Sequence, residues 1–205
     1  MPQEYARLDL AREIKTEGGN TSREVVVLRP TAKGMIDVLS ELKVSAQLKR
    51  LVTTCCRAVN GTGSLLMFSS DELDAADGAE LSAVVAALSQ EAEDIDIGPG
   101  DGVFEPLVYN LRYPIELAPP NGDVIRQIEF QARRLGDLSE YLDARGAGEE
   151  FFAFMRCFGT LLGTNLPMTD SIIGAMDFLD YLVIRRKVMG KLTASRGRWK
   201  KTLIS

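Results

Sequence analysis

The residues of this sequence whose types could do chemistry are its cysteines and a few carboxylates. Cys55, Cys56 and Cys157 are odd in number and two are adjacent, which is not the pattern of a disulfide framework. The 205 residues include no histidine, so the commonest general base and the commonest transition-metal ligand are missing. The sequence also lacks a phosphate-binding glycine loop, a nucleophile elbow and a serine-lysine pair at helical spacing. We therefore expect reduced core cysteines in a protein with no catalytic residues, no metal and no cofactor.

Two aspartates, Asp77 and Asp177, occupy positions where the helical pattern predicts an apolar residue. A buried carboxylate is costly unless it is paired or accepts several hydrogen bonds. We expect both to be structural charge anchors, accepting bonds from a helix N-terminus or from an upstream arginine, Arg29 or Arg133. The alternative is that they line a binding groove. A catalytic pair is not expected, because the two aspartates belong to different halves of the sequence.

The composition is that of a globular protein. Hydrophobic residues make up 45% and charged residues 26% of the chain, which is close to the average for packed domains. No apolar run approaches the ~20 residues that would span a bilayer, and the first residues lack the basic and apolar regions of a secretory signal. We expect a protein of the cytoplasm with no membrane partner.

The two halves of the chain show the same order of landmarks. Each opens with strand, turn and strand, over 8–29 and 111–133, and the Asn121-Gly122 pair is a strong hairpin signal. A short helix follows, over 35–42 and 138–144. A longer amphipathic helix comes next, marked by Leu48, Leu51, Val52, Cys55 and Val59 in one half and by Phe151, Phe154, Met155, Phe158 and Leu162 in the other. The last helix begins after Ser69 or Thr169, and the pairs Cys55/Cys157 and Gly61/Gly163 share an offset of 102 (157 − 55 and 163 − 61).

These landmarks predict an α+β fold made of two related modules, each a β-hairpin followed by about three helices. We expect the first module over 1–90, an acidic Gly/Pro linker over 91–106, the second module over 107–192, and a basic tail over 193–205. The linker is predicted to be solvated because acids alternate in it with glycine and proline.

The charge distribution indicates a protein partner. No lysine or arginine occurs from Asp71 to Glu105, whereas basic residues follow Asp180 without any acid. The tail residues Arg196, Arg198, Trp199 and Lys200 are predicted to bind a partner, as is Phe152, which lies off the core face of its helix. A nucleic-acid adaptor is a further hypothesis, but the sequence pI of about 5.0 favours a protein partner. A second copy of this chain, forming a homo-oligomer, is a further hypothesis for the partner.

A family resemblance rests on the order of these elements. In the second half the resemblance rests on the segments Leu111 to Ile115, Asn121-Gly122, Arg133 to Leu138 and Ile173 to Asp177. In the first half it rests on Leu28 to Gly34 and Leu73 to Asp77. The sequence resembles the phage tail assembly chaperones of Mu-like and other contractile-tailed phages, here as a tandem duplication.

The resemblance implies a protein without catalytic activity that holds the long, helical, apolar tape-measure protein in solution during tail assembly. Members mostly carry one module, so the second module and the basic tail depart from the family pattern. The alternative is a structural subunit of the baseplate or tail tip, which would place the protein in the virion tail.

Overall fold

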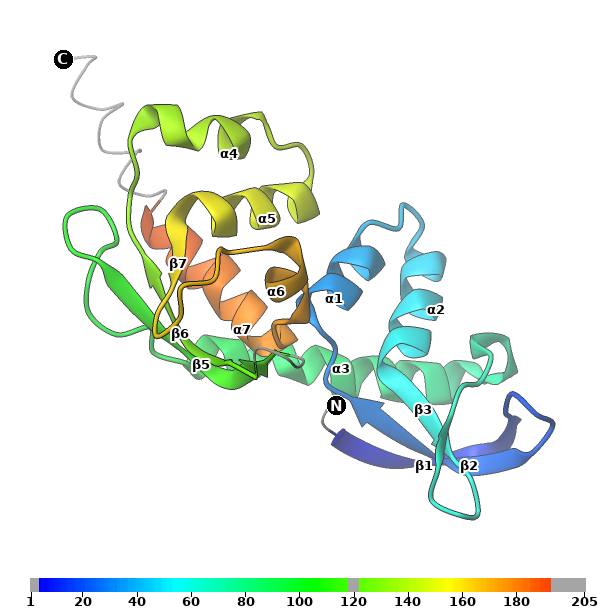
Figure 1. The fold of residues 1–205 in the computed structure, drawn as a ribbon. Coiled ribbons are helices and arrows are strands. Elements are labelled where there is room, and N and C mark those ends of the chain that lie inside the picture. The colour runs from blue at the N-terminus through cyan, green and yellow to red at the C-terminus, as the bar shows by residue number, and fades with distance from the viewer. Residues whose placement is uncertain (1–3, 118–121, 193–205) are drawn as a thin grey trace. The chain divides into compact units, whose positions relative to one another are not determined.

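The computed structural model describes residues 4–117 and 122–192 and confirms the predicted α+β class (Figure 1). Two antiparallel sheets are present, one of four strands and one of three. The chain divides into two compact units, Met1–Glu91 and Ala92–Ser205. The predicted hairpin turn at Asn121 and the basic tail, with Arg196, Arg198, Trp199 and Lys200, lie outside the described residues.

The first unit is a four-stranded sheet, in the order β1-β2-β3-β4, with a pair of helices beside it. In chain order its elements are β1 (Glu4–Lys15), β2 (Thr21–Leu28), α1 (Ala32–Leu39), α2 (Val44–Cys55), β3 (Cys56–Val59), β4 (Leu65–Leu66), the short 3-10 helix η1 (Ser70–Glu72) and α3 (Ala75–Asp94). Three consecutive valines of β2, Val25, Val26 and Val27, are fully buried. Since neighbouring strand residues point to opposite faces, both faces of β2 are covered.

The helices α1 and α2 stand side by side, and α2 leads directly into β3 (Figure 1). Thr31 caps the start of α1 by accepting a hydrogen bond from the Gly34 N–H, a common way to satisfy the free donors of a helix end. Gly34 also lets α2 approach closely, because a Cβ built there would lie 3.0 Å from Thr54 Cγ2.

The second unit is a three-stranded sheet, in the order β5-β6-β7, with an aromatic core. Its elements are β5 (Leu107–Glu116), β6 (Val124–Phe130), the 3-10 helix η2 (Leu135–Leu138), α4 (Ser139–Asp143), α5 (Ala147–Phe158), β7 (Gly159–Leu161), α6 (Asp170–Ala175), α7 (Phe178–Val183) and the π-helical turn η3 (Ile184–Val188). Phe154 of α5 stacks on Phe130 at 5.8 Å and on Phe158 at 4.9 Å between ring centroids. Such offset pairs add to the stabilisation that burial provides.

The segment 91–106 is not the solvated linker that the sequence predicts. The helix α3 continues to Asp94, and Ile97 is buried. The Gly102 carbonyl accepts a hydrogen bond of 2.6 Å from the Ala132 N–H, beyond the end of β6. Lys187 of η3 donates to the carbonyl oxygens of Glu93 and Ile95, each at 2.6 Å. The acids therefore sit on a segment that packs within the second unit and is held there by C-terminal bases.

Short strands follow the long helices directly, which the sequence analysis missed. The predicted helix face includes Val59 and Leu162, but α2 ends at Cys55 and α5 at Phe158, and β3 and β7 begin at the next residue. β3 pairs with β2 and β7 pairs with β6. Pairing with an existing strand here outweighs the helical pattern, as tertiary context often does.

The two units share local features, while the predicted module repeat remains a prediction. Both hairpins have a register shift within the longer strand, between Asp9 and Ile14 and between Asn110 and Ile115, and the first hairpin has a second shift between Glu4 and Ala6. The helices α2 and α5 are 12 residues long and begin and end at an offset of 103 (147 − 44 and 158 − 55). This offset differs from the 102 predicted from the cysteines. Accordingly, Cys55 is buried and Cys157 is partly exposed, so the two are not at equivalent buried positions.

Candidate partner-binding surface

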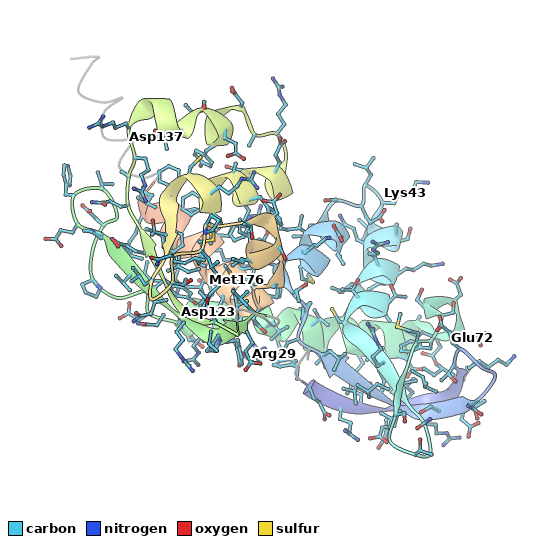
Figure 2. All side chains as sticks on the ribbon, viewed as in Figure 1. Arg29, Lys43, Glu72, Asp123, Asp137 and Met176 are labelled. Carbon is cyan, nitrogen blue, oxygen red and sulfur yellow. The ribbon has the colours of Figure 1, made fainter. Side chains whose placement is uncertain are left out.

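The first unit exposes four large aliphatic side chains at one end of the α1–α2 hairpin. Leu42 is 99% and Val44 81% exposed, and Leu39 and Leu48 are 47% and 42% exposed. We call these four residues the hairpin tip. Lys43, which Figure 2 labels, lies at the turn that joins the two helices, between Leu42 and Val44 in the sequence. Scattered exposed leucines are ordinary, but four within ten residues form a patch of the kind that marks protein interfaces.

The hairpin tip continues the buried face of α2 beyond the core. Val44, Leu48, Leu51 and Cys55 follow one another at spacings of four, three and four, and therefore form one stripe along the helix. Cys55 is fully buried and Leu51 partly buried, whereas the two residues of the first turns are exposed. This spacing is that of helix-to-helix seams. A partner helix lying on the hairpin tip would extend the packing that the unit already uses.

Basic side chains accompany the hairpin tip. Lys43 and Arg50 are exposed, and within the described ranges neither forms an ion pair. Lys49 differs, because it pairs with Asp71 of η1. Glu41, which is partly exposed, lies one residue before Leu42, and Arg50 falls off the apolar stripe of α2 at helical spacing. The hairpin tip is therefore defined by its aliphatic side chains and not by one sign of charge.

The most deeply buried carboxylate belongs to Asp180, which the sequence analysis did not single out. Its Oδ1 accepts hydrogen bonds from the Tyr109 hydroxyl at 2.6 Å and the Arg112 N–H at 3.0 Å, and its Oδ2 accepts one from the Tyr113 N–H at 3.1 Å. All three donors belong to β5, and the two backbone N–H groups lie within its register shift, where they have no partner on β6. Burial raises the pKa of Asp180 above its usual range, against the lowering effect of these hydrogen bonds. Asp180 thus fixes α7 to β5.

The raised pKa of Asp180 predicts that its contribution to stability falls as pH rises. A carboxyl group with a higher pKa in the folded state contributes fully below its unfolded pKa of about 4, and the contribution is lost as pH rises through the folded pKa. The difference in free energy of unfolding between the wild type and Asp180→Asn should therefore shrink as pH rises above about 4. Denaturant titrations at several pH values measure it. A difference that stays constant, or grows, would contradict the prediction.

The predicted anchor Asp77 is buried, and its visible hydrogen bond comes from a strand. Its Oδ1 accepts a bond of 3.2 Å from the Ala11 N–H of β1, at the register shift of the first hairpin. Within the described part of the chain its Oδ2 is buried without a hydrogen-bond partner. The backbone N–H of Asp77 in turn donates to Asp74 Oδ1 at 2.8 Å. This arrangement does not support the hypothesis that Asp77 lines a binding groove, because its carboxylate faces a strand of its own unit.

The prediction for Asp177 needs correction, because this residue is not on the buried face of a helix. It is partly exposed and caps the start of α7, where its Oδ1 accepts a hydrogen bond of 2.8 Å from the Leu179 N–H. The single predicted helix is divided here into α6 and α7. Asp180, one turn later, is the aspartate that is buried as we expected for Asp177.

The two predicted arginines lie in different surroundings. Arg29 is buried, with its guanidinium 5.5 Å from the centre of the Tyr5 ring, a cation–π distance; Figure 2 labels it beside the first sheet. Arg133 is exposed and donates to Thr160 Oγ1 at 2.7 Å. Phe152, the predicted partner-binding residue on α5, is only partly exposed and contacts the buried Phe151 edge-on at 6.5 Å. The structure does not gather these residues at one site.

No protein-family model, curated protein or solved structure matches this chain. Over residues 4–117 and 122–192 the structure contains no group of three or more cysteine, aspartate or glutamate residues placed to hold a metal ion. In the same ranges no helix is long and apolar enough to cross a membrane. The surface with the clearest chemical character is therefore the hairpin tip.

Proposed function

We propose that this protein is a non-enzymatic phage tail assembly protein that holds an apolar helical segment of the tape-measure protein on its hairpin tip. The observation that carries the proposal is the exposed aliphatic stripe of α1 and α2, at a spacing that suits a second helix. The resemblance to tail assembly chaperones supplies the identity of the partner.

Purified virions and co-expression test this role. A holding chaperone keeps a co-expressed tape-measure protein soluble and is absent from finished virions. A protein present in virions at a fixed copy number would instead be a structural baseplate or tail-tip subunit. Failure to solubilise the tape-measure protein would overturn the holding role.

The double substitution Leu42→Ser and Val44→Ser should weaken binding without destabilising the fold. Both side chains are largely exposed, so their loss costs the folded state little, whereas each could contribute about 1 to 2 kcal/mol when a partner covers it. We expect at least about a tenfold loss of affinity. The measurement is fluorescence anisotropy with a labelled synthetic helix that carries leucine at heptad spacing.

Leu142→Ser is the matched control. Leu142 is 50% exposed on α4 of the second unit, so Leu142→Ser removes exposed aliphatic surface outside the hairpin tip, although less of it than the double substitution removes. An equal effect of both variants would contradict a specific role for the tip.

A further inference from the structure

A turn in the second unit holds an aromatic ring in solvent. Phe104 is 82% exposed, although the backbone around it is tightly fixed. Asp101 Oδ1 accepts hydrogen bonds from the N–H groups of Val103, Phe104 and Glu105, at 2.9, 2.9 and 3.3 Å. The Gly102 N–H closes the turn by donating to the Glu105 carbonyl at 2.9 Å. A bare ring on a preorganised backbone loses little entropy on binding, which is typical of an anchor for a partner segment.

The surroundings of this ring are acidic. Asp96, Asp101 and Glu105 are exposed, and no lysine or arginine occurs between Asp71 and Glu105. The three backbone hydrogen bonds hold the pKa of Asp101 below its ordinary value, so this carboxylate is charged at neutral pH. The surface therefore fits a segment that is both basic and apolar.

Bases near the C-terminus already bind the segment that leads into the turn, in order along the chain. Arg186 pairs with Glu93 at 2.7 Å, and Lys187 donates to the Glu93 and Ile95 carbonyls. Lys191 then donates to the carbonyls of Gly98 and Gly100, at 3.4 and 3.3 Å. Each later base contacts a later part of the acidic segment, so the next bases along the chain would meet the turn itself.

The last described residue lies against the same turn. A Cβ built on Gly102 would be 2.7 Å from Leu192 Cδ2, so the chain leaves the described structure beside the turn. The residues that follow, 193–205, contain no acid, and include Arg196, Arg198, Lys200, Lys201 and the single tryptophan, Trp199. An extended chain covers up to ~3.3–3.6 Å per residue, so this segment is long enough to reach Phe104.

We propose that the basic segment 196–204 docks on the Asp101–Pro106 turn of its own chain, with Trp199 on Phe104 and the arginines beside Asp101 and Glu105. Tethering gives the segment a high effective concentration at this surface, so that modest contacts are sufficient. Aromatic contact supplies the apolar part and charge complementarity the polar part. The inference goes beyond the proposed function, since it uses no residue of the hairpin tip.

Trp199 is itself the probe for the test, because its fluorescence reports on one site only. Acrylamide quenching of the full-length protein at low salt should rise at least about twofold in Phe104→Ser, where the indole loses its cover. Glu105→Lys should raise it as well, and so should high salt, which screens exposed charges. Val124→Ser, which alters another exposed residue of the same unit (41% exposed), should leave quenching unchanged.

Two results would overturn the proposal. One is quenching in the wild type that equals that of Phe104→Ser. The other is protection that disappears on dilution, which would assign the contact to a neighbouring copy. Because Phe104 is exposed, its substitution does not threaten folding, and failure of the tape-measure experiments would leave this result untouched.

Discussion

Asp180→Ala is expected to destabilise the second unit by about 3 to 5 kcal/mol, since it removes the acceptor of three hydrogen bonds in the interior. The Tyr109 hydroxyl and the N–H groups of Arg112 and Tyr113 would all lose their partner. Each buried donor left unsatisfied costs about 1 to 3 kcal/mol. Chemical denaturation gives the size of the loss, and hydrogen exchange followed by mass spectrometry assigns it to the second unit.

Two further variants separate this role from a general effect of losing a buried acid. Tyr109→Phe removes one donor and keeps the carboxylate, and should cost about 1 to 2 kcal/mol. Asp77→Ala removes a buried acid of the first unit, for which one hydrogen bond is seen, and should cost about 1 kcal/mol. A loss from Asp180→Ala no larger than that from Asp77→Ala would show that the three bonds do not act together.

The hairpins and the amphipathic helices could be predicted because their signals are local. Alternation in β1 and β6, and three- and four-residue spacing in α2 and α5, are properties of short windows. The N-caps Thr31 and Thr169 act through donors three residues ahead. The α+β class follows from these elements alone.

The short strands and the packed acidic segment depend on contacts that a window of sequence does not contain. β3 exists because β2 lies beside it, and its first residue follows a helix without a connecting loop. The segment 91–106 has the composition of a linker, yet Lys187, from a distant part of the chain, binds its carbonyls. The partners of such segments become visible only once the fold brings them together.

The candidate site likewise depends on contacts that local sequence does not show. The spacing of Val44, Leu48 and Cys55 places them on one face of α2, which the pattern predicts to be buried. This prediction is correct for Cys55. The sequence does not show how far along the helix the covering elements reach, so it could not predict that the first turns are bare. Asp180 did leave a signal, as one acid inside the apolar run 178–184, but the Asp177 N-cap three residues earlier fits a helical pattern equally well.

The cysteines provide a large and easily measured effect. Burial raises the pKa of Cys55 to about 12 and that of Cys56 to about 12. The thiolate is the reactive form, so a thiol with a pKa of about 12 is about a thousandfold less ionised at neutral pH than one at 9. Burial also raises the pKa of Cys157, but its side chain on α5 is partly exposed.

We therefore expect a thiol reagent to modify Cys157 first, and Cys55 and Cys56 at least about a hundredfold more slowly. Both slow thiols lie at the α2–β3 junction, where the backbone passes directly from helix to strand. They become accessible only when this junction opens, so their rate measures local opening of the first unit. Cys157→Ser should leave only the slow phase, and in denaturant all thiols should react at similar rates. Fast modification of Cys157→Ser in the folded state would show that the junction is open in solution and that the burial of Cys55 and Cys56 does not protect them.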